Sequence, residues 1–168
     1  MELKVLILLI FLVAASIWDL KERCIPVWVF SLTGIVIVFL ELVFILNEMS
    51  GIMEEAEYAA VAVKQVMVTA NGILTVKLGG MAVGFALLVI SKLTQGQIGE
   101  GDGITFLITG FSLGFGDNFL LLLEALLLSF AWSLVLMFMK KINLKTSLPF
   151  LPFVLTAFII RMVPQMFF

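Results

Sequence analysis

Histidine is absent from the 168 residues of this chain, and Cys24 is its only cysteine. Without histidine, the usual zinc sites and the pairs in which histidine activates a serine or cysteine nucleophile are excluded. A single cysteine also excludes an intrachain disulfide. We therefore expect neither a metal nor another cofactor. Of the catalytic groups that buried sites commonly use, paired carboxylates remain.

Charged residues are scarce, at 13% of the chain, whereas 62% of the residues are hydrophobic and the mean hydropathy is +1.22. This composition predicts an integral membrane protein whose surroundings are the lipid bilayer. The net charge of -2 and the lack of a basic tract argue against a nucleic-acid partner. The first apolar run ends in Trp18-Asp19-Leu20-Lys21, which has no small-residue cleavage site, so it is not expected to be a secretory signal.

The apolar runs predict an all-α fold, a polytopic bundle of about six transmembrane helices that forms one domain over residues 1–168. A crossing helix needs about 20 apolar residues, or fewer where the bilayer thins. The fourth and fifth runs are divided at Gly114–Asn118, because glycine and Asp-Asn interrupt helices. The expected spans are Leu3–Trp18, Pro26–Leu46, Val76–Leu93, Gly103–Phe115, Asn118–Met139 and Leu148–Val163.

The longest stretch outside these spans is Glu54–Thr75, whose apolar residues recur at near-helical spacing. It is expected to be a helix on the outer membrane surface, and a loop explains the pattern equally well.

Two spans separate Asp19 from Asp102, so both acids are expected on one face of the membrane. More lysines and arginines are expected on that face than on the other, so it is expected to be cytoplasmic. These residues are Lys21, Arg23, Lys92, Lys140, Lys141 and Lys145.

Asp19 ends the first apolar run, and Asp102 precedes the fourth. Gly99 and Gly101 bracket Glu100 just before Asp102, and glycine suits a pocket in which a backbone approaches closely. Two carboxylates that share one proton can hydrolyse a peptide bond. One accepts a proton from water while the other donates to the scissile carbonyl oxygen.

Each acid also has a simpler interpretation. Asp102 would serve as the N-cap of the helix that follows it, and Asp19 would form an interfacial salt bridge with Lys21 or Arg23. A small ion-coupled membrane transporter is a further alternative, in which buried acids mark an ion path. Those acids would be Asp19, Asp102, Glu41 and Glu124.

Three short motifs resemble those of the type IV prepilin peptidases, in the same order along the chain. Asp19-Leu-Lys-Glu-Arg-Cys-Ile25-Pro26 resembles their aspartate, five residues and Ile-Pro. Gly99-Glu-Gly-Asp102 resembles their GxGD motif, and Leu148-Pro149-Phe-Leu-Pro152-Phe153 is similar to the Pro-Phe-x-Pro-Phe that begins a late helix. Val27 and Ile104 differ from the asparagine and lysine often found beside the first two motifs.

The resemblance implies an intramembrane aspartyl endopeptidase with Asp19 and Asp102 as the catalytic pair. Its substrate would be a prepilin or pseudopilin, whose basic leader is removed after a glycine at the cytoplasmic face of the cell (inner) membrane. Glu100 is the candidate contact for that leader. Only Asp19–Ile25 joins the first two spans, so the chain resembles the compact form that lacks a methyltransferase segment.

A GxGD protease for other transmembrane substrates stays a second enzymatic alternative. The residues that support the motifs are Gly99, Gly101, Ile25, Pro26, Pro149 and Pro152.

Overall fold

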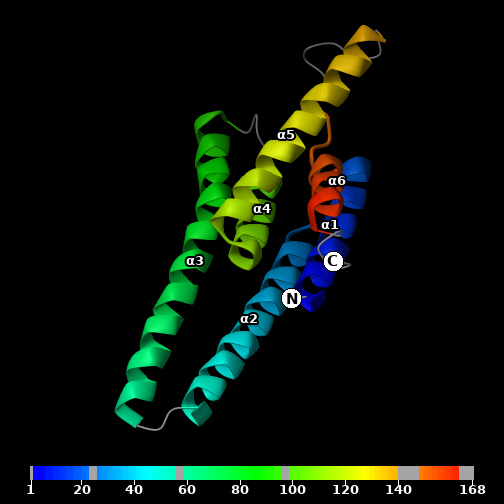
Figure 1. Ribbon diagram of the computed structural model, residues 1–168. Coiled ribbons are helices and arrows are strands. Elements are labelled where there is room, and N and C mark those ends of the chain that lie inside the picture. The colour runs from blue at the N-terminus through cyan, green and yellow to red at the C-terminus, as the bar shows by residue number, and fades with distance from the viewer. Residues whose placement is uncertain (1, 23–25, 56–58, 96–98, 140–147, 163–168) are drawn as a thin grey trace.

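The computed structural model describes residues 2–22, 26–55, 59–95, 99–139 and 148–162 (Figure 1). All regular secondary structure in these ranges is helical, which confirms the all-α prediction. The described helices are α1 (Glu2–Glu22), α2 (Val27–Glu55), α3 (Ala59–Leu93), α4 (Glu100–Leu113), α5 (Phe115–Phe138) and α6 (Leu151–Met162).

Within the described ranges, three helical segments are long and apolar enough to cross a membrane. They are Trp28–Asn47, Val66–Leu93 and Phe115–Phe138. These segments support a membrane protein, whereas a bundle of six crossing helices stays a prediction. With 14 and 12 residues, α4 and α6 are short. At about 1.5 Å per residue they are roughly 20 Å long, less than the ~30 Å of a bilayer's hydrocarbon core.

The helix predicted over Glu54–Thr75 is confirmed from Ala59 onward, and the loop alternative is wrong there. This part continues without a break into the predicted third span as α3, so it is not a helix of its own. The stretch contains no proline, and Gly72 costs a helix only about 1 kcal/mol relative to alanine, too little to end it. Residues 56–58 lie outside the described ranges.

The division predicted between the fourth and fifth spans is confirmed at Gly114. This glycine has φ +85 and separates α4 from α5, and its N–H donates to the carbonyl oxygen of Gly110. Glycine adopts this conformation at little cost, whereas other residues are strained in it. Because α5 already begins at Phe115, Asp117 lies in its first turn and not in the turn predicted between the two helices.

Glycines bring α3 and α4 into backbone contact. A Cβ atom on Gly80 would overlap the carbonyl oxygen of Gly110, and one on Gly84 would overlap the amide nitrogen of Leu107. On α4, a Cβ on Gly103 would lie 2.7 Å from the side chain of Leu88. Small residues spaced four apart commonly allow such close packing between membrane helices. Helix α4 is thus fixed against α3 along its length. Figure 1 shows α4 beside the middle of the bundle, overlapped by the lower end of α5.

A buried amide links α5 to this pair. The Asn118 side chain is fully buried, and its Nδ2 donates to the carbonyl oxygens of Gly80 at 3.1 Å and Phe106 at 2.9 Å. Its Oδ1 accepts a hydrogen bond from the Thr109 hydroxyl at 2.7 Å. Buried polar groups need such partners, so these bonds tie three helices at one point.

Helices α1 and α6 pack side by side and form a second unit. Buried positions of α1 recur every three or four residues, which places them on one helical face. The fully buried side chains on the two helices include Leu8, Leu12 and Ala15 of α1 and Val154 and Phe158 of α6. Asp19 lies about one turn after Ala15 on this same face of α1, toward the start of α6.

Candidate active site

Asp19 is half-buried near the C-terminal end of α1 and contacts the first residue of α6. The backbone N–H of Leu151 donates a hydrogen bond of 3.1 Å to Oδ2 of Asp19. The first amides of a helix lack partners within it and carry partial positive charge, so a carboxylate is stabilised there. The observed partner of Asp19 is thus the start of α6. Of the two cations in the salt-bridge alternative, Arg23 lies outside the described residues.

Asp102 is the third residue of α4 and is half-buried. The N-cap position belongs to Gly99, which makes no side-chain cap bond, and the Asp102 N–H donates to the Gly99 carbonyl oxygen at 3.1 Å. The alternative that Asp102 caps this helix is therefore wrong. A Cβ on Gly99 would lie 3.2 Å from Oδ2 of Asp102, so the first glycine of the GxGD motif lies against the carboxyl group.

The two carboxyl groups interact electrostatically. Asp102 precedes the predicted span Gly103–Phe115, and its pKa is raised from 3.8 to about 7, first by burial and second by the negative charge of Asp19. Burial disfavours the charged form of a carboxyl group, and a neighbouring anion disfavours it further. Near neutral pH, Asp102 therefore exists to a large extent as the protonated acid beside Asp19.

The Leu148–Phe153 segment contacts both helices that carry the acids. The ring of Phe150 lies against that of Phe106, with centroids 6.4 Å apart, and Phe106 is fully buried one turn after Asp102. The next residue, Leu151, provides the N–H that binds Asp19. The Pro-Phe motif marked this segment in the sequence. The sequence did not identify Phe106, Phe150 or the Leu151 amide as parts of the site.

The remaining motif residues lie near the helix ends. Glu100 is the exposed first residue of α4, followed by half-buried Gly101. Half-buried Pro26 precedes α2, and its carbonyl oxygen accepts the Val29 N–H at 3.0 Å, which begins that helix. Ile25 lies outside the described residues.

The acids of the proposed ion path do not share one environment. Glu41 is buried on α2, and its Oε1 lies 2.9 Å from Nζ of Lys77 on α3, which also donates to the Ser112 carbonyl oxygen at 3.0 Å. Glu124 lies 2.9 Å from Arg161. Two of the four acids are therefore matched with cations from other helices, an arrangement typical of charges that stabilise helix packing.

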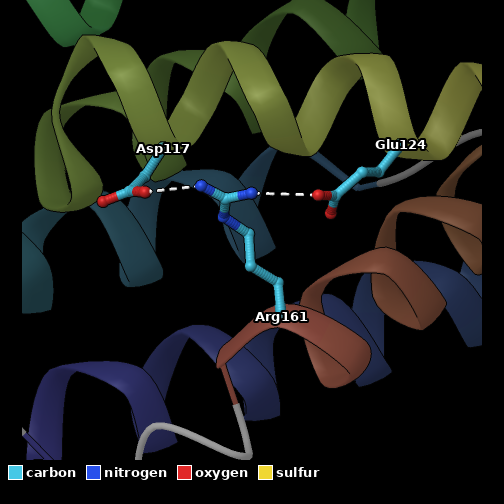
Figure 2. A network of polar contacts seen from close by, with 3 residues as sticks. All are labelled: Asp117, Glu124 and Arg161. Atoms are coloured by element: carbon cyan, nitrogen blue, oxygen red, sulfur yellow. Dashed lines mark hydrogen bonds and ion pairs between the residues drawn. The ribbon is translucent and has the colours of Figure 1, made fainter.

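Figure 2 shows Arg161 of α6 reaching toward two acids of α5. Its guanidinium donates to Glu124 at 2.9 Å and to Asp117 at 2.8 Å. Arg161 thus pairs with Glu124, one of the acids of the proposed ion path. The contact with Asp117 was not predicted, because that residue was assigned to a turn.

The chain was compared with protein-family models, with curated proteins and with solved structures, and none of the three comparisons gave a match. The two acids and the contacts that position them are therefore the basis for a functional proposal.

Proposed function

We propose that this chain is an intramembrane aspartyl endopeptidase with Asp19 and Asp102 as its catalytic pair. The observation that carries the proposal is the placement of two half-buried acids on helices that meet where Phe106 packs on Phe150. Asp19 accepts the Leu151 N–H, and the pKa of Asp102 is raised by burial and by the charge of Asp19. A carboxyl group that keeps its proton near neutral pH beside a second carboxylate is the arrangement that aspartyl proteases use. The apolar helices support a location in a membrane.

The contacts suggest a role for each acid. Asp19 accepts the Leu151 N–H at Oδ2, which orients its carboxyl group and leaves Oδ1 to accept a proton from a water molecule. Protonated Asp102 donates to the carbonyl oxygen of the scissile peptide bond. The water oxygen attacks the carbonyl carbon and forms a tetrahedral intermediate. As the C–N bond breaks, Asp19 gives the proton that it took from water to the leaving amine, and Asp102 regains its proton from the hydroxyl group on the former carbonyl oxygen.

The proposed substrate is the precursor of a type IV pilin or pseudopilin, cut at the cytoplasmic face of the cell membrane. This part of the proposal comes from the resemblance of the three motifs to those of the prepilin peptidases. Glu100 is exposed next to Asp102 and would meet a cation of the leader. The process served would be pilus assembly or protein secretion.

Cleavage of a prepilin that carries its leader tests the proposal. We expect the chain, purified and reconstituted in lipid, to convert the precursor to its mature length. Asp19→Asn and Asp102→Asn should each abolish conversion, because one acid must accept a proton and the other must donate one. Asp117→Asn is the matched control and should retain near-normal turnover, since Asp117 lies on α5 and pairs with Arg161 of α6.

Two results would contradict the proposal. One is the absence of conversion by the wild-type chain across a range of leaders. The other is near-normal turnover by either the Asp19→Asn or the Asp102→Asn variant. Circular dichroism of each variant in lipid separates loss of chemistry from loss of fold.

A further inference from the structure

A groove lies between α5 and the segment that leads into α6. Its volume is about 490 Å³, within the range of ligand sites. Both of its walls are described: α5 contributes one side, and the Pro-Phe motif contributes the other. The lining residues are Leu126, Ser129, Phe130 and Ser133 on α5, and Leu148, Pro149, Phe150 and Phe153 opposite.

This groove adjoins the acid pair. Pro149 and Phe150 form part of its wall, and the amide of the next residue, Leu151, binds Asp19. The ring of Phe150 also packs on Phe106, one turn from Asp102. A chain that lies in the groove therefore contacts the same short segment that binds Asp19 and packs on Phe106.

The lining favours a peptide over a lipid tail. Its walls are aromatic and aliphatic, but Ser129 and Ser133 place two hydroxyl groups four residues apart on one face of α5. The Ser129 hydroxyl donates to the Leu126 carbonyl oxygen at 2.9 Å, and its oxygen keeps acceptor capacity. A peptide backbone offers N–H groups to such oxygens, whereas an acyl chain offers no donor.

We propose that this groove binds the apolar stretch of the peptide substrate next to the scissile bond. The inference rests on the proposed function and adds to it a binding site for the substrate. Apolar side chains would contact Phe130, Phe150 and Phe153, while the two serines would accept backbone N–H groups. The groove would thus fix the position of the scissile bond relative to Asp19 and Asp102.

Filling the groove tests the inference. Ser133→Phe should raise the KM for prepilin cleavage about tenfold, the discrimination that a misfit in an apolar pocket typically produces, with kcat changed less. Ala131→Phe adds similar bulk at an exposed position of the same helix and is the matched control. It should leave both constants unchanged. An unchanged KM for Ser133→Phe, with the wild type active, would overturn the groove assignment alone, whereas an inactive wild type would overturn the proposed function.

Photo-crosslinking covers the case in which Ser133→Phe does not fold. A benzophenone amino acid is placed at position 133 or 131 of the Asp102→Asn chain in lipid, and the same prepilin is added. We expect an adduct with prepilin from position 133 and none from position 131. Adducts with lipid alone from position 133, or equal prepilin adducts from both positions, would overturn the inference.

Discussion

The N–H of Leu151 binds the carboxylate of Asp19 across 132 positions of sequence, over a distance of 3.1 Å. This bond joins the end of α1 to the start of α6. It occupies one carboxylate oxygen and places the anion at the positive end of a helix. Asp102 has no such partner in the cap of its own helix and has a raised pKa. The two acids thus have different environments, which suits different roles in proton transfer.

The pH dependence of turnover follows from Asp102. Its pKa is raised to about 7, so it keeps the proton needed by a general acid up to that pH and loses it above. We expect kcat for prepilin cleavage to fall as the pH rises through about 7. A kcat–pH profile in lipid measures this, and a constant kcat from about pH 6 to about pH 8 would contradict it.

The same shift affects stability. Between pH 3.8 and about 7, the folded chain holds a proton on Asp102 that the unfolded chain has released. The contribution of this group to the free energy of unfolding therefore decreases as the pH rises across that window. Within that interval, the melting temperature of the wild type should fall with rising pH relative to that of Asp102→Asn, whose side chain does not titrate. Parallel curves throughout would show that the pKa is not raised.

Both acids should be reached from the same side of the membrane. Leu20 and Glu100 are exposed neighbours of Asp19 and Asp102, and they suit cysteine substitution in a Cys24→Ser background. A membrane-impermeant maleimide should label both positions from the cytoplasmic face. Labelling of the two positions from opposite faces would exclude a shared site.

The contact between α3 and α4 should be sensitive to a single methyl group. Gly84→Ala places a Cβ on the backbone of Leu107, and overpacking of this kind typically costs about 1–3 kcal/mol. Gly79→Ala is the matched control, since nothing lies within 4 Å of its new atom, and it should be neutral or up to about 1 kcal/mol stabilising. Unfolding in mixed detergent micelles compares them, and equal stability of the two variants would refute the close packing.

A charge effect is expected for Glu100. If it meets a cation of the leader, Glu100→Gln should raise the KM for a leader with several lysines by up to about several fold, because exposed ion pairs contribute ~0–1 kcal/mol. The effect should be larger at low salt, with kcat unchanged. Glu22→Gln, at an exposed acid beside Lys21, is the control. Equal kinetics across leader charge and salt would leave Glu100 without a role in recognition.

Much of the helical framework could be predicted from the sequence, because long apolar runs favour helices in a membrane and glycines favour breaks between them. The break at Gly114 is an example, since glycine readily adopts its positive φ. The full length of α3 could not be predicted in the same way. Lys64, Asn71 and Gly72 lower the hydropathy of its first half, but hydropathy measures lipid contact and not helical continuity.

The site was predictable in its acids but not in its contacts. Asp19 and Asp102 stand out because each adjoins an apolar run and a short motif. The bond from Leu151 to Asp19 depends on how α1 and α6 pack, which local sequence does not encode. The same holds for the pairing of Asp117 with Arg161, which required knowing that α5 begins two residues before Asp117.

The glycine contact between α3 and α4 has a mechanical consequence. With backbone against backbone at Gly80 and Gly84, α4 cannot slide or tilt without moving α3, so Asp102 moves only with that pair. Asp19 moves with α1 and α6. The spacing of the acids therefore depends on the contacts between these two helix pairs, such as the one between Phe106 and Phe150. A lipid or a mutation that changes the contact between the two helix pairs is therefore expected to change the distance between the carboxyl groups, even if it contacts neither acid.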